Sequence, residues 1–361
     1  MKRWLIMLWL SLLAVGAMFG EFIAPYDVRT QHRPFIGLPP MPIRFIDEHG
    51  RFHLRPFVYA VQRDLSVPGR HYTENRQERY PLAFFVRGDS YKLLGVFEGS
   101  LHLFGLQVPN QQQVTANTLQ PTTTRVHLLG TDRLGRDVFS RLVYGCRVTL
   151  SIALSSLVVA LVLGVSIGGV SGYFGGRVDA VLMRLGELVQ SIPAIFLILA
   201  LRAAFPLDIS YAQTLAILIA IFALVSWPEV SRLVRSNVLT LMSREFVVSA
   251  KAVGAPDSWV IRHHILPNAL TPALVQATII VPSFILGEAA LSFLGVGIQE
   301  PQPSWGNMLS AARELPVLLN DWWILMPGVA ILVTVLTFNA LGDAVRDWLD
   351  PRSRTRPSEW G

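Results

Sequence analysis

The chain has 361 residues, of which 52% are hydrophobic and 16% are charged. Soluble domains are usually about one quarter charged, so this composition indicates a protein that lies in a lipid bilayer. The formal net charge is +6, but the basic residues flank apolar runs instead of forming one face with aromatic side chains, which argues against nucleic acid as a partner. Cys146 is the single cysteine, which excludes an internal disulfide and a metal site built from several thiolates.

The first apolar run, Trp4–Ala24, follows two basic residues and is long enough to cross a bilayer, which takes about 20 apolar residues. A cleaved signal peptide is the alternative, because Val15-Gly16-Ala17 resembles a cleavage site. The run continues through Phe22, beyond the apolar part of most signal peptides, so a retained helix is favoured. In either case the residues that follow are expected outside the cytoplasm.

The segment 25–128 is rich in Pro, Arg, Gln and aromatic residues and holds no run long enough to cross a bilayer. Pro42–Ile46 and Arg51–Tyr59 are extended runs on either side of an Asp-Glu-His-Gly turn. Tyr80–Val86 and Tyr91–Phe97 repeat this pattern around Arg-Gly-Asp-Ser, where Gly-Asp is ordinary turn chemistry and gives no support for adhesion. We therefore expect a β-rich extracytoplasmic insertion between the first and second spans.

Five further apolar runs bring the total to six predicted spans, so the fold class is an all-α membrane protein. The runs are Val148–Val170, Val181–Ala203, Ala212–Val230, Ala269–Leu294 and Trp322–Leu341. Arginine and lysine crowd the loop before the fifth span and the tail after the sixth, and such residues mark the cytoplasmic side. Both termini are therefore expected in the cytoplasm, and the protein in the cytoplasmic membrane.

The loop before the fifth span has the pattern of two short helices joined by a break. Residues 245–253 favour a helix, and Gly254 provides a left-handed exit from it. Pro256 and Asp257 open a second helix, with Asp257 as the expected N-cap. Leu266-Pro267 is expected to end that helix and to begin the fifth span. The sequence thus predicts a stiff cytoplasmic elbow that can convey motion from a partner to a membrane helix.

Three motifs occur in order along the chain. They are Leu129–Arg141, the elbow segment Glu245–Leu270, and Gly287–Gly297 followed by Pro303-Ser304-Trp305-Gly306. Together they resemble the ATP-binding-cassette importer permeases of the dipeptide/oligopeptide/nickel family, in particular the second, C-type permease subunit. The resemblance covers about Leu129–Pro351, and it implies a six-helix permease bundle.

The elbow resembles the coupling loop that, in this family, docks on a separate ATPase subunit. By that resemblance the ATPase-coupling residues are Ser249, Ala250, Gly254, Ala255, Pro256, Asp257, Leu266 and Pro267. The chain departs from the family at Val248, which stands where the signature Glu is expected, so a contact that needs the acidic group is not implied. The insertion is also longer than the linker typical of the family.

The resemblance further implies a homologous second permease, two ATP-binding-cassette ATPase subunits and an extracytoplasmic solute-binding protein as partners. The chain holds no Gly-x-x-x-x-Gly-Lys-Ser/Thr run, so ATP and Mg are expected on the ATPase subunits, and no cofactor or enzymatic activity is expected of this chain. Gly172–Asp179 is Gly-rich but lacks the Lys, and it predicts a tight turn between the second and third spans. Peptides are the first substrate class, with nickel complexes, glutathione and oligosaccharides left open.

Four polar residues of the predicted spans are candidates for the translocation path, because a charged side chain at a helix centre costs about 2.5–3.5 kcal/mol on insertion scales and so needs a reason. Glu187 and Gln190 share one face of the third span because they are three residues apart, and Pro193 is expected to kink the helix just beyond them. Gln276 and Glu288 lie in the fifth span. Each of the four either lines the translocation path or ties neighbouring helices together.

Small residues recur in the second span and at its exit, and such residues let helices pack closely. They are Gly164, Ser166, Gly168, Gly169, Ser171 and Gly172. We therefore expect this span to lie in close contact with a neighbouring helix.

The predicted organisation has four parts: the first membrane helix 1–24, the insertion 25–128, the permease core 129–345 with its coupling loop 231–267, and the cytoplasmic tail 346–361. An ion-gradient-driven secondary transporter is the alternative function. That class should show internal repeats with broken helices at matching positions, and no convincing repeat relates the two halves of the core. A membrane-anchored sensor is disfavoured, because six spans exceed what an anchor needs.

Overall fold

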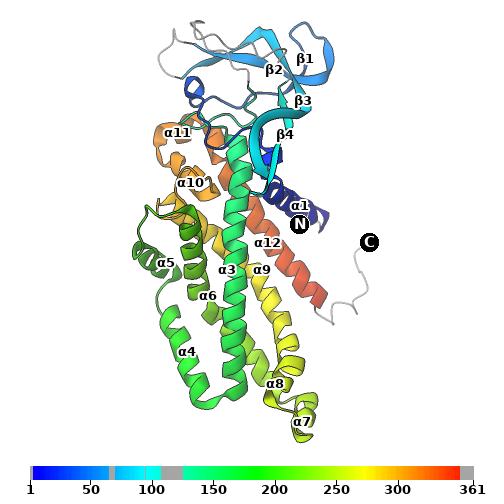
Figure 1. Ribbon diagram of the computed structural model, residues 1–361, viewed down its shortest axis with the longest axis vertical. Helices are drawn as coiled ribbons and strands as arrows, with labels where there is room; N and C mark the ends of the chain where they lie inside the picture. The colour runs from blue at the N-terminus through cyan, green and yellow to red at the C-terminus, as the bar shows by residue number, and fades with distance from the viewer. Residues whose placement is uncertain (1–2, 65–69, 94, 107–124, 350–361) are drawn as a thin grey trace. The chain divides into compact units, whose positions relative to one another are not determined.

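The computed structural model describes residues 3–64, 70–93, 95–106 and 125–349 (Figure 1). The chain divides into two compact units. The helical unit consists of Met1–Trp9, Leu150–Leu291 and Ile331–Gly361, and the sheet unit consists of Leu10–Thr149 and Ser292–Ala330.

A four-stranded antiparallel sheet with the strand order β1-β2-β3-β4 occupies the sheet unit. Its strands are β1 (Arg44–Ile46), β2 (Phe52–Arg63), β3 (Tyr72–Leu93) and β4 (Phe97–Leu106). The predicted turn between the first two extended runs is confirmed, because the carboxylate of Asp47 accepts the N–H groups of His49 and Arg51 there. The pKa of Asp47 is lowered to about 2, and the hydrogen bond with His53 contributes most to this shift. The two backbone hydrogen bonds lower the pKa further.

The second predicted turn is wrong. Arg-Gly-Asp-Ser lies inside β3, whose register against β4 shifts between Arg87 and Tyr91, and the chain reverses around Gly95, where φ is +76°. Gly88 is needed within the strand because the ring of His102 lies where a side chain would begin, 2.7 Å from an added Cβ. Turn-forming residues therefore build a bulge here, which bends the strand without ending it.

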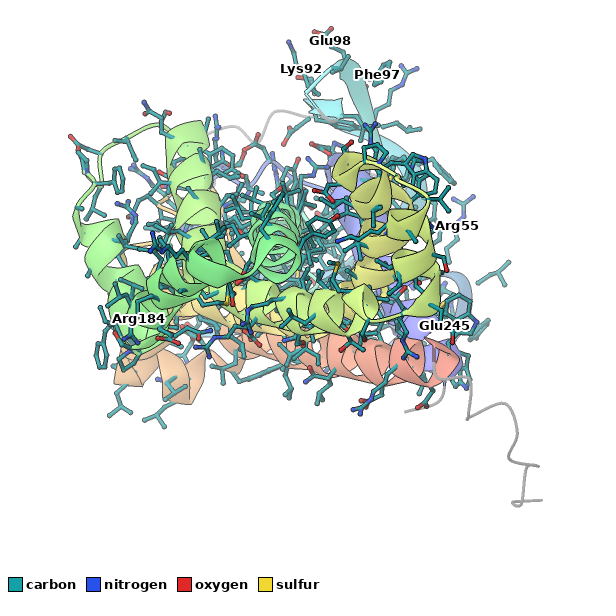
Figure 2. The ribbon with its side chains drawn as sticks, turned by 90° about the horizontal axis from the view of Figure 1, so that it is seen from below. Arg55, Lys92, Phe97, Glu98, Arg184 and Glu245 are labelled. Atoms are coloured by element: carbon teal, nitrogen blue, oxygen red, sulfur yellow. The ribbon has the colours of Figure 1, made fainter. Side chains whose placement is uncertain are left out.

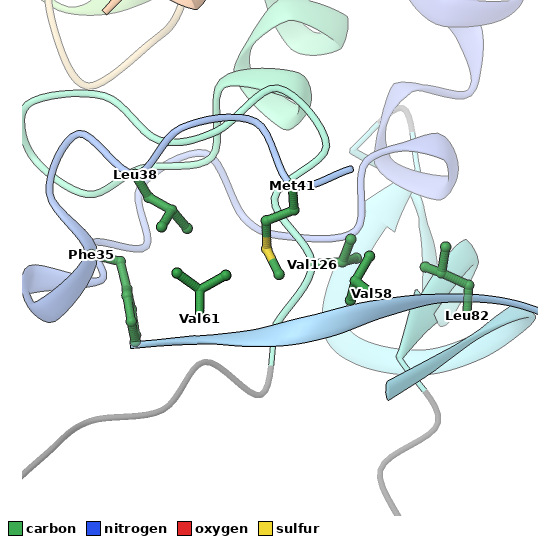
Figure 3. Packing of buried hydrophobic residues seen from close by; sticks show 7 residues of the cluster. All are labelled: Phe35, Leu38, Met41, Val58, Val61, Leu82 and Val126. Atoms are coloured by element: carbon green, nitrogen blue, oxygen red, sulfur yellow. The ribbon is translucent and has the colours of Figure 1, made fainter. Parts of the chain in front are cut away.

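The core of the sheet unit is apolar and draws on residues far apart in the sequence (Figure 3). It consists of Phe35, Leu38, Met41, Val58, Val61, Leu82 and Val126. Short helices complete the unit: α2 (Gly20–Ile23), η1 (Arg33–Phe35), α10 (Trp305–Leu309), η3 (Ser310–Arg313), α11 (Leu315–Asn320) and η4 (Trp322–Leu325).

Long apolar helices make up most of the helical unit. Its elements are α3 (Val138–Phe174), α4 (Gly176–Gln190), α5 (Ala194–Ala203), α6 (Tyr211–Met242), α7 (Glu245–Ala252), α8 (Asp257–Val260), η2 (Ile261–Ile265), α9 (Leu266–Phe293) and α12 (Met326–Leu349). Both α3 and α12 begin in the sheet unit, and the last two residues of α9 lie in it. Within the described residues, four helical stretches are long and apolar enough to cross a membrane, and α4 and α5 together would form a fifth, bent by 86°. The kink predicted at Pro193 is thus confirmed as a full break.

The first helix, α1 (Arg3–Met18), is shorter than the predicted run Trp4–Ala24. Its 16 residues extend about 24 Å, below the roughly 30 Å thickness of a bilayer core. Phe19 leaves the helical conformation, with ψ at +26°, and the short helix α2 follows.

The helix α3 begins ten residues before the predicted span because its polar first turns find partners. Asp137 caps it, since the carboxylate accepts the N–H of Ser140 at 2.7 Å and lies 2.8 Å from Nδ1 of His127. The guanidinium of Arg147 donates to both carboxylate oxygens of Glu21. After Arg147 the helix contains no charged residue.

Candidate functional site

The predicted elbow is present in the helical unit and is held mainly by backbone hydrogen bonds. α7 ends in a Schellman motif: Gly254 has φ +84°, its N–H donates to Lys251 O, and the N–H of Ala255 donates to Ala250 O, both at 3.0 Å. α8 then starts at Asp257, with its first bonds made to Pro256 O. The bend is therefore fixed by the main chain and by one residue that tolerates a positive φ.

Two local predictions at the elbow are wrong. Asp257 is the first residue of α8 and Pro256 occupies the cap position. Leu266-Pro267 does not end the second helix, because α8, η2 and α9 form one continuous helix over Asp257–Phe293. Residues 261–265 widen into a π turn, in which Leu266 N–H donates to Ile261 O. We attribute the wider turn to Pro267, which has no N–H and whose ring crowds the preceding turn.

Tyr173, at the end of α3, connects the elbow to the second predicted span. Its hydroxyl donates to the carboxylate of Asp257, and the ammonium of Lys251 lies 4.5 Å from the centre of its ring. One buried aromatic side chain thus contacts both arms of the elbow, by a hydrogen bond to one and a cation–π contact to the other. Tyr173 was not among the predicted site residues, because its partners lie about 80 residues away in the sequence.

The elbow presents an apolar surface around its bend. Val253 is 88% exposed, and Val248, Phe246 and Trp259 are also exposed. Val247 and Val260 are fully buried and attach the two arms to the rest of the unit. His263 and His264 both contact the ring of Trp259, at 4.8 and 5.0 Å between ring centres. The elbow is therefore anchored on one side and open on the other, as a docking surface requires.

The four polar residues predicted within the spans have different surroundings. Glu187 is exposed and pairs with Arg184 at 2.8 Å and with Arg232 at 3.8 Å. Gln190, one turn further on, is also exposed. The amide of Gln276 donates to Glu229 at 2.6 Å. Glu288 has no exposed surface.

In the sheet unit, the first sequence motif contacts Glu300, which lies between the two stretches of the third motif. Its carboxylate accepts from Arg136 at 2.5 Å and from Arg141 at 2.9 Å, and Arg136 also donates to Asp132 at 2.7 Å. Burial lowers the pKa of Arg136, but Asp132 and Glu300 outweigh it and raise that pKa above its ordinary value. Trp305 of the third motif donates from its ring N–H to Leu142 O at 3.0 Å. These motifs form a structural network, and no spacing rule in the sequence predicted the part played by Glu300.

Residues 148–355 match the family described as binding-protein-dependent transport system inner membrane component. A dipeptide transport system permease protein, DppC of Alkalihalophilus pseudofirmus, is 41% identical over 66% of this chain and 76% of its own length. A probable D,D-dipeptide transport system permease protein, DdpC of Escherichia coli, is 39% identical over 69% of this chain and 81% of its own length. An inward-facing crystal structure of the MetNI methionine transporter is 21% identical over 59% of this chain and 98% of that chain, with a TM-score of 0.47.

The chain therefore belongs to the family of binding-protein-dependent transport system inner membrane components. It is a multi-pass protein of the inner membrane and the permease subunit of an ATP-driven importer. The resemblance found in the three sequence motifs is confirmed.

Proposed function

We propose that this chain is the C-type permease of an importer for dipeptides and related short peptides. Relatives about 40% identical over two thirds of the chain are named for dipeptide and D,D-dipeptide transport. The main observation in support of a coupling mechanism is that the elbow is continuous with a membrane helix, since Asp257–Phe293 is one helical stretch. A force applied to α8 is thereby applied to α9.

The proposed assembly contains a homologous second permease, two ATP-binding-cassette ATPase subunits and an extracytoplasmic solute-binding protein. ATP and Mg bind to the ATPase subunits. The proposed topology has six spans, with α1 as the first and the bent pair α4–α5 as the third. Both termini and the elbow then face the cytoplasm, and the four-stranded sheet lies outside. The arginine-rich loop before α9 supports this orientation.

The exposed side of the elbow is the proposed docking surface for an ATPase subunit, with Ser249, Ala250 and the segment Gly254–Asp257 at its centre. Leu266 and Pro267 lie where the elbow becomes α9 and pass the motion on. Closure of the ATPase pair on ATP would displace the elbow as a unit, because its bend is fixed by backbone hydrogen bonds. The motion would reach α9 directly and α3 through Tyr173.

We assign Glu187, Gln190 and Gln276 to the translocation path, because each keeps part of its side chain at the surface. Glu288 is fully buried, so we assign it to a tie between neighbouring helices and not to the path.

The test replaces Gly254 in the complete transporter, reconstituted in vesicles with dipeptide outside and ATP inside. Gly254→Pro cannot adopt a positive φ and removes the N–H that bonds to Lys251 O. We expect this variant to insert and assemble but to lose ATP-dependent uptake.

Gly254→Asn is the matched control, because Asn tolerates the left-handed conformation, and it should keep most of the uptake. Normal uptake by Gly254→Pro would refute the coupling role of the elbow. Uptake without ATP would refute the ATP-driven importer itself.

A further inference from the structure

The end of the β3–β4 hairpin is tied to the region where the membrane helices begin. One ring nitrogen of the buried His102 on β4 lies 2.7 Å from Ala24 O, just after α2. The ring of Phe85 on β3 lies 6.1 Å from that of Phe22 on α2. Lys92 and Glu98 line one pocket together with residues of the chain after α1 and of α3. The hairpin is therefore attached to the part of the sheet unit that holds α2 and the first turns of α3.

Arg147 is the last charged residue of α3, and it pairs with Glu21. This ion pair joins α2 to α3, and α3 carries no charge from Val148 to its end at Phe174. Glu21 lines the same pocket as Lys92 and Tyr144. A Tyr one turn before the apolar stretch is typical of the interfacial zone of a bilayer, where amphipathic aromatic side chains gather. The hairpin end thus lies beside the boundary between apolar and polar helix surface.

The hairpin end exposes several apolar side chains. Because side chains alternate along a strand, Phe97 and Leu101 share one face of β4, and both are exposed. Val96 is 72% and Phe97 is 67% exposed, and Figure 2 shows Phe97 with Lys92 and Glu98 at the end of the hairpin. Met18 and Phe19, which shortly precede the pocket residue Glu21, are exposed as well. Exposed apolar side chains therefore occur on both of the segments that meet at this pocket.

We propose that the β3–β4 hairpin end is a lipid anchor, with Val96 and Phe97 inserted among the headgroups of the outer leaflet. The ligand is the bilayer surface itself, and the pocket that joins the hairpin end to Glu21 and Tyr144, just before the uncharged stretch of α3, argues for it. The proposal rests on the proposed function, because it needs the topology in which the sheet lies outside. It gives the insertion a role: the sheet is held at a fixed height at the membrane surface.

The test places a spin label at single cysteines of the complete transporter in nanodiscs of phosphatidylethanolamine and phosphatidylglycerol. Cys146 is buried and is replaced by Ser in every variant. Collision rates are measured with oxygen, which concentrates in lipid, and with a water-soluble nickel complex. Phe97→Cys tests whether the hairpin end lies in the bilayer surface. Gln77→Cys, on the exposed far half of β3, is the control for a position in water, and Val162→Cys, in the middle of α3, is the control for a position in lipid.

We expect a higher oxygen-to-nickel collision ratio at position 97 than at 77, and a lower one than at 162. A ratio at 97 equal to that at 77 would overturn the proposal, because the hairpin end would then lie in water. Shielding of position 97 from both probes would also overturn it, because protein would then cover the patch. If position 162 itself reads as water, the membrane topology of the proposed function fails, which distinguishes that failure from a failure of the anchor alone.

Discussion

Tyr173 illustrates what a single side chain contributes to the proposed coupling. It is almost fully buried at the end of α3, where its hydroxyl binds Asp257 and its ring contacts Lys251. A sequence pattern predicts residues that share a helix face or a turn, and Tyr173 shares neither with its partners. The backbone bend at Gly254, by contrast, was predictable because a left-handed exit from a helix requires a particular residue type.

Removal of the Tyr173 hydroxyl should weaken coupling without unfolding the protein. In Tyr173→Phe the ring and its contact with Lys251 remain, but Asp257 loses its donor. A hydrogen bond of this kind contributes about 1 kcal/mol, so a roughly fivefold loss of ATP-dependent dipeptide uptake is expected. The measurement compares uptake with ATPase activity in the same vesicles. Uptake unchanged from the parent would show that α3 receives no force through this contact.

For contacts between two elements, the sequence predicts the type of packing but not which element is the partner. The small residues of the second span predicted close helix packing, and the structure confirms it. Gly164, Gly168 and Gly172, spaced by four, all face α6. A Cβ on Gly168 would lie 2.4 Å from Ser231 O, whereas Gly169, on another face, has open space. The identity of the partner helix could not be predicted, because small residues show only that some backbone approaches.

Replacement of Gly168 by Ala should separate α3 from α6, and the neighbouring position provides the control. Gly168→Ala is expected to lower the thermal unfolding temperature in detergent and to reduce the yield of assembled transporter, because the backbone of α6 must shift. Gly169→Ala should be neutral or stabilising by up to about 1 kcal/mol, since Ala favours a helix more than Gly does. Equal behaviour of the two variants would contradict close packing at Gly168.

Element boundaries were predicted less well than element types, for physical reasons. The early start of α3 depends on Arg147 finding Glu21 at a separation of 126 residues. The strand β3 passes through Gly-Asp because β4 supplies partners on the other side of the bulge. The elbow helix passes through Leu266-Pro267 because a π turn absorbs the proline. In each case a tertiary partner or a local distortion overrides the local sequence preference.

For the whole molecule, the family and the elbow were predictable because they depend on motifs in a fixed order. The six-span topology remains a prediction, since α1 is short. It requires the α3–α4 turn and the sheet to lie on opposite sides of the membrane. Arg177, in the first turn of α4, and Gln77, in β3, are both exposed and are each replaced by Cys, and Cys146 is buried.

A membrane-impermeant maleimide should therefore modify position 77 in spheroplasts and position 177 only in inside-out vesicles. Full modification at each accessible position and little at the other is the expected result, because the reagent does not cross the bilayer. Modification of both positions from the same side would rule out the proposed orientation.

The Schellman bend at Gly254 has a consequence for how such importers diversify. Because main-chain bonds set its shape, side chains on its solvent face can be exchanged without changing its angle. By the family resemblance, Val248 in place of an acidic residue would be one such exchange. The residues that recognise the ATPase subunit could then change between relatives while the angle of the elbow stays constant. If residues 245–260 of this permease are replaced by those of a relative, the chimaera should accordingly bind the relative's ATPase subunit in preference to its own.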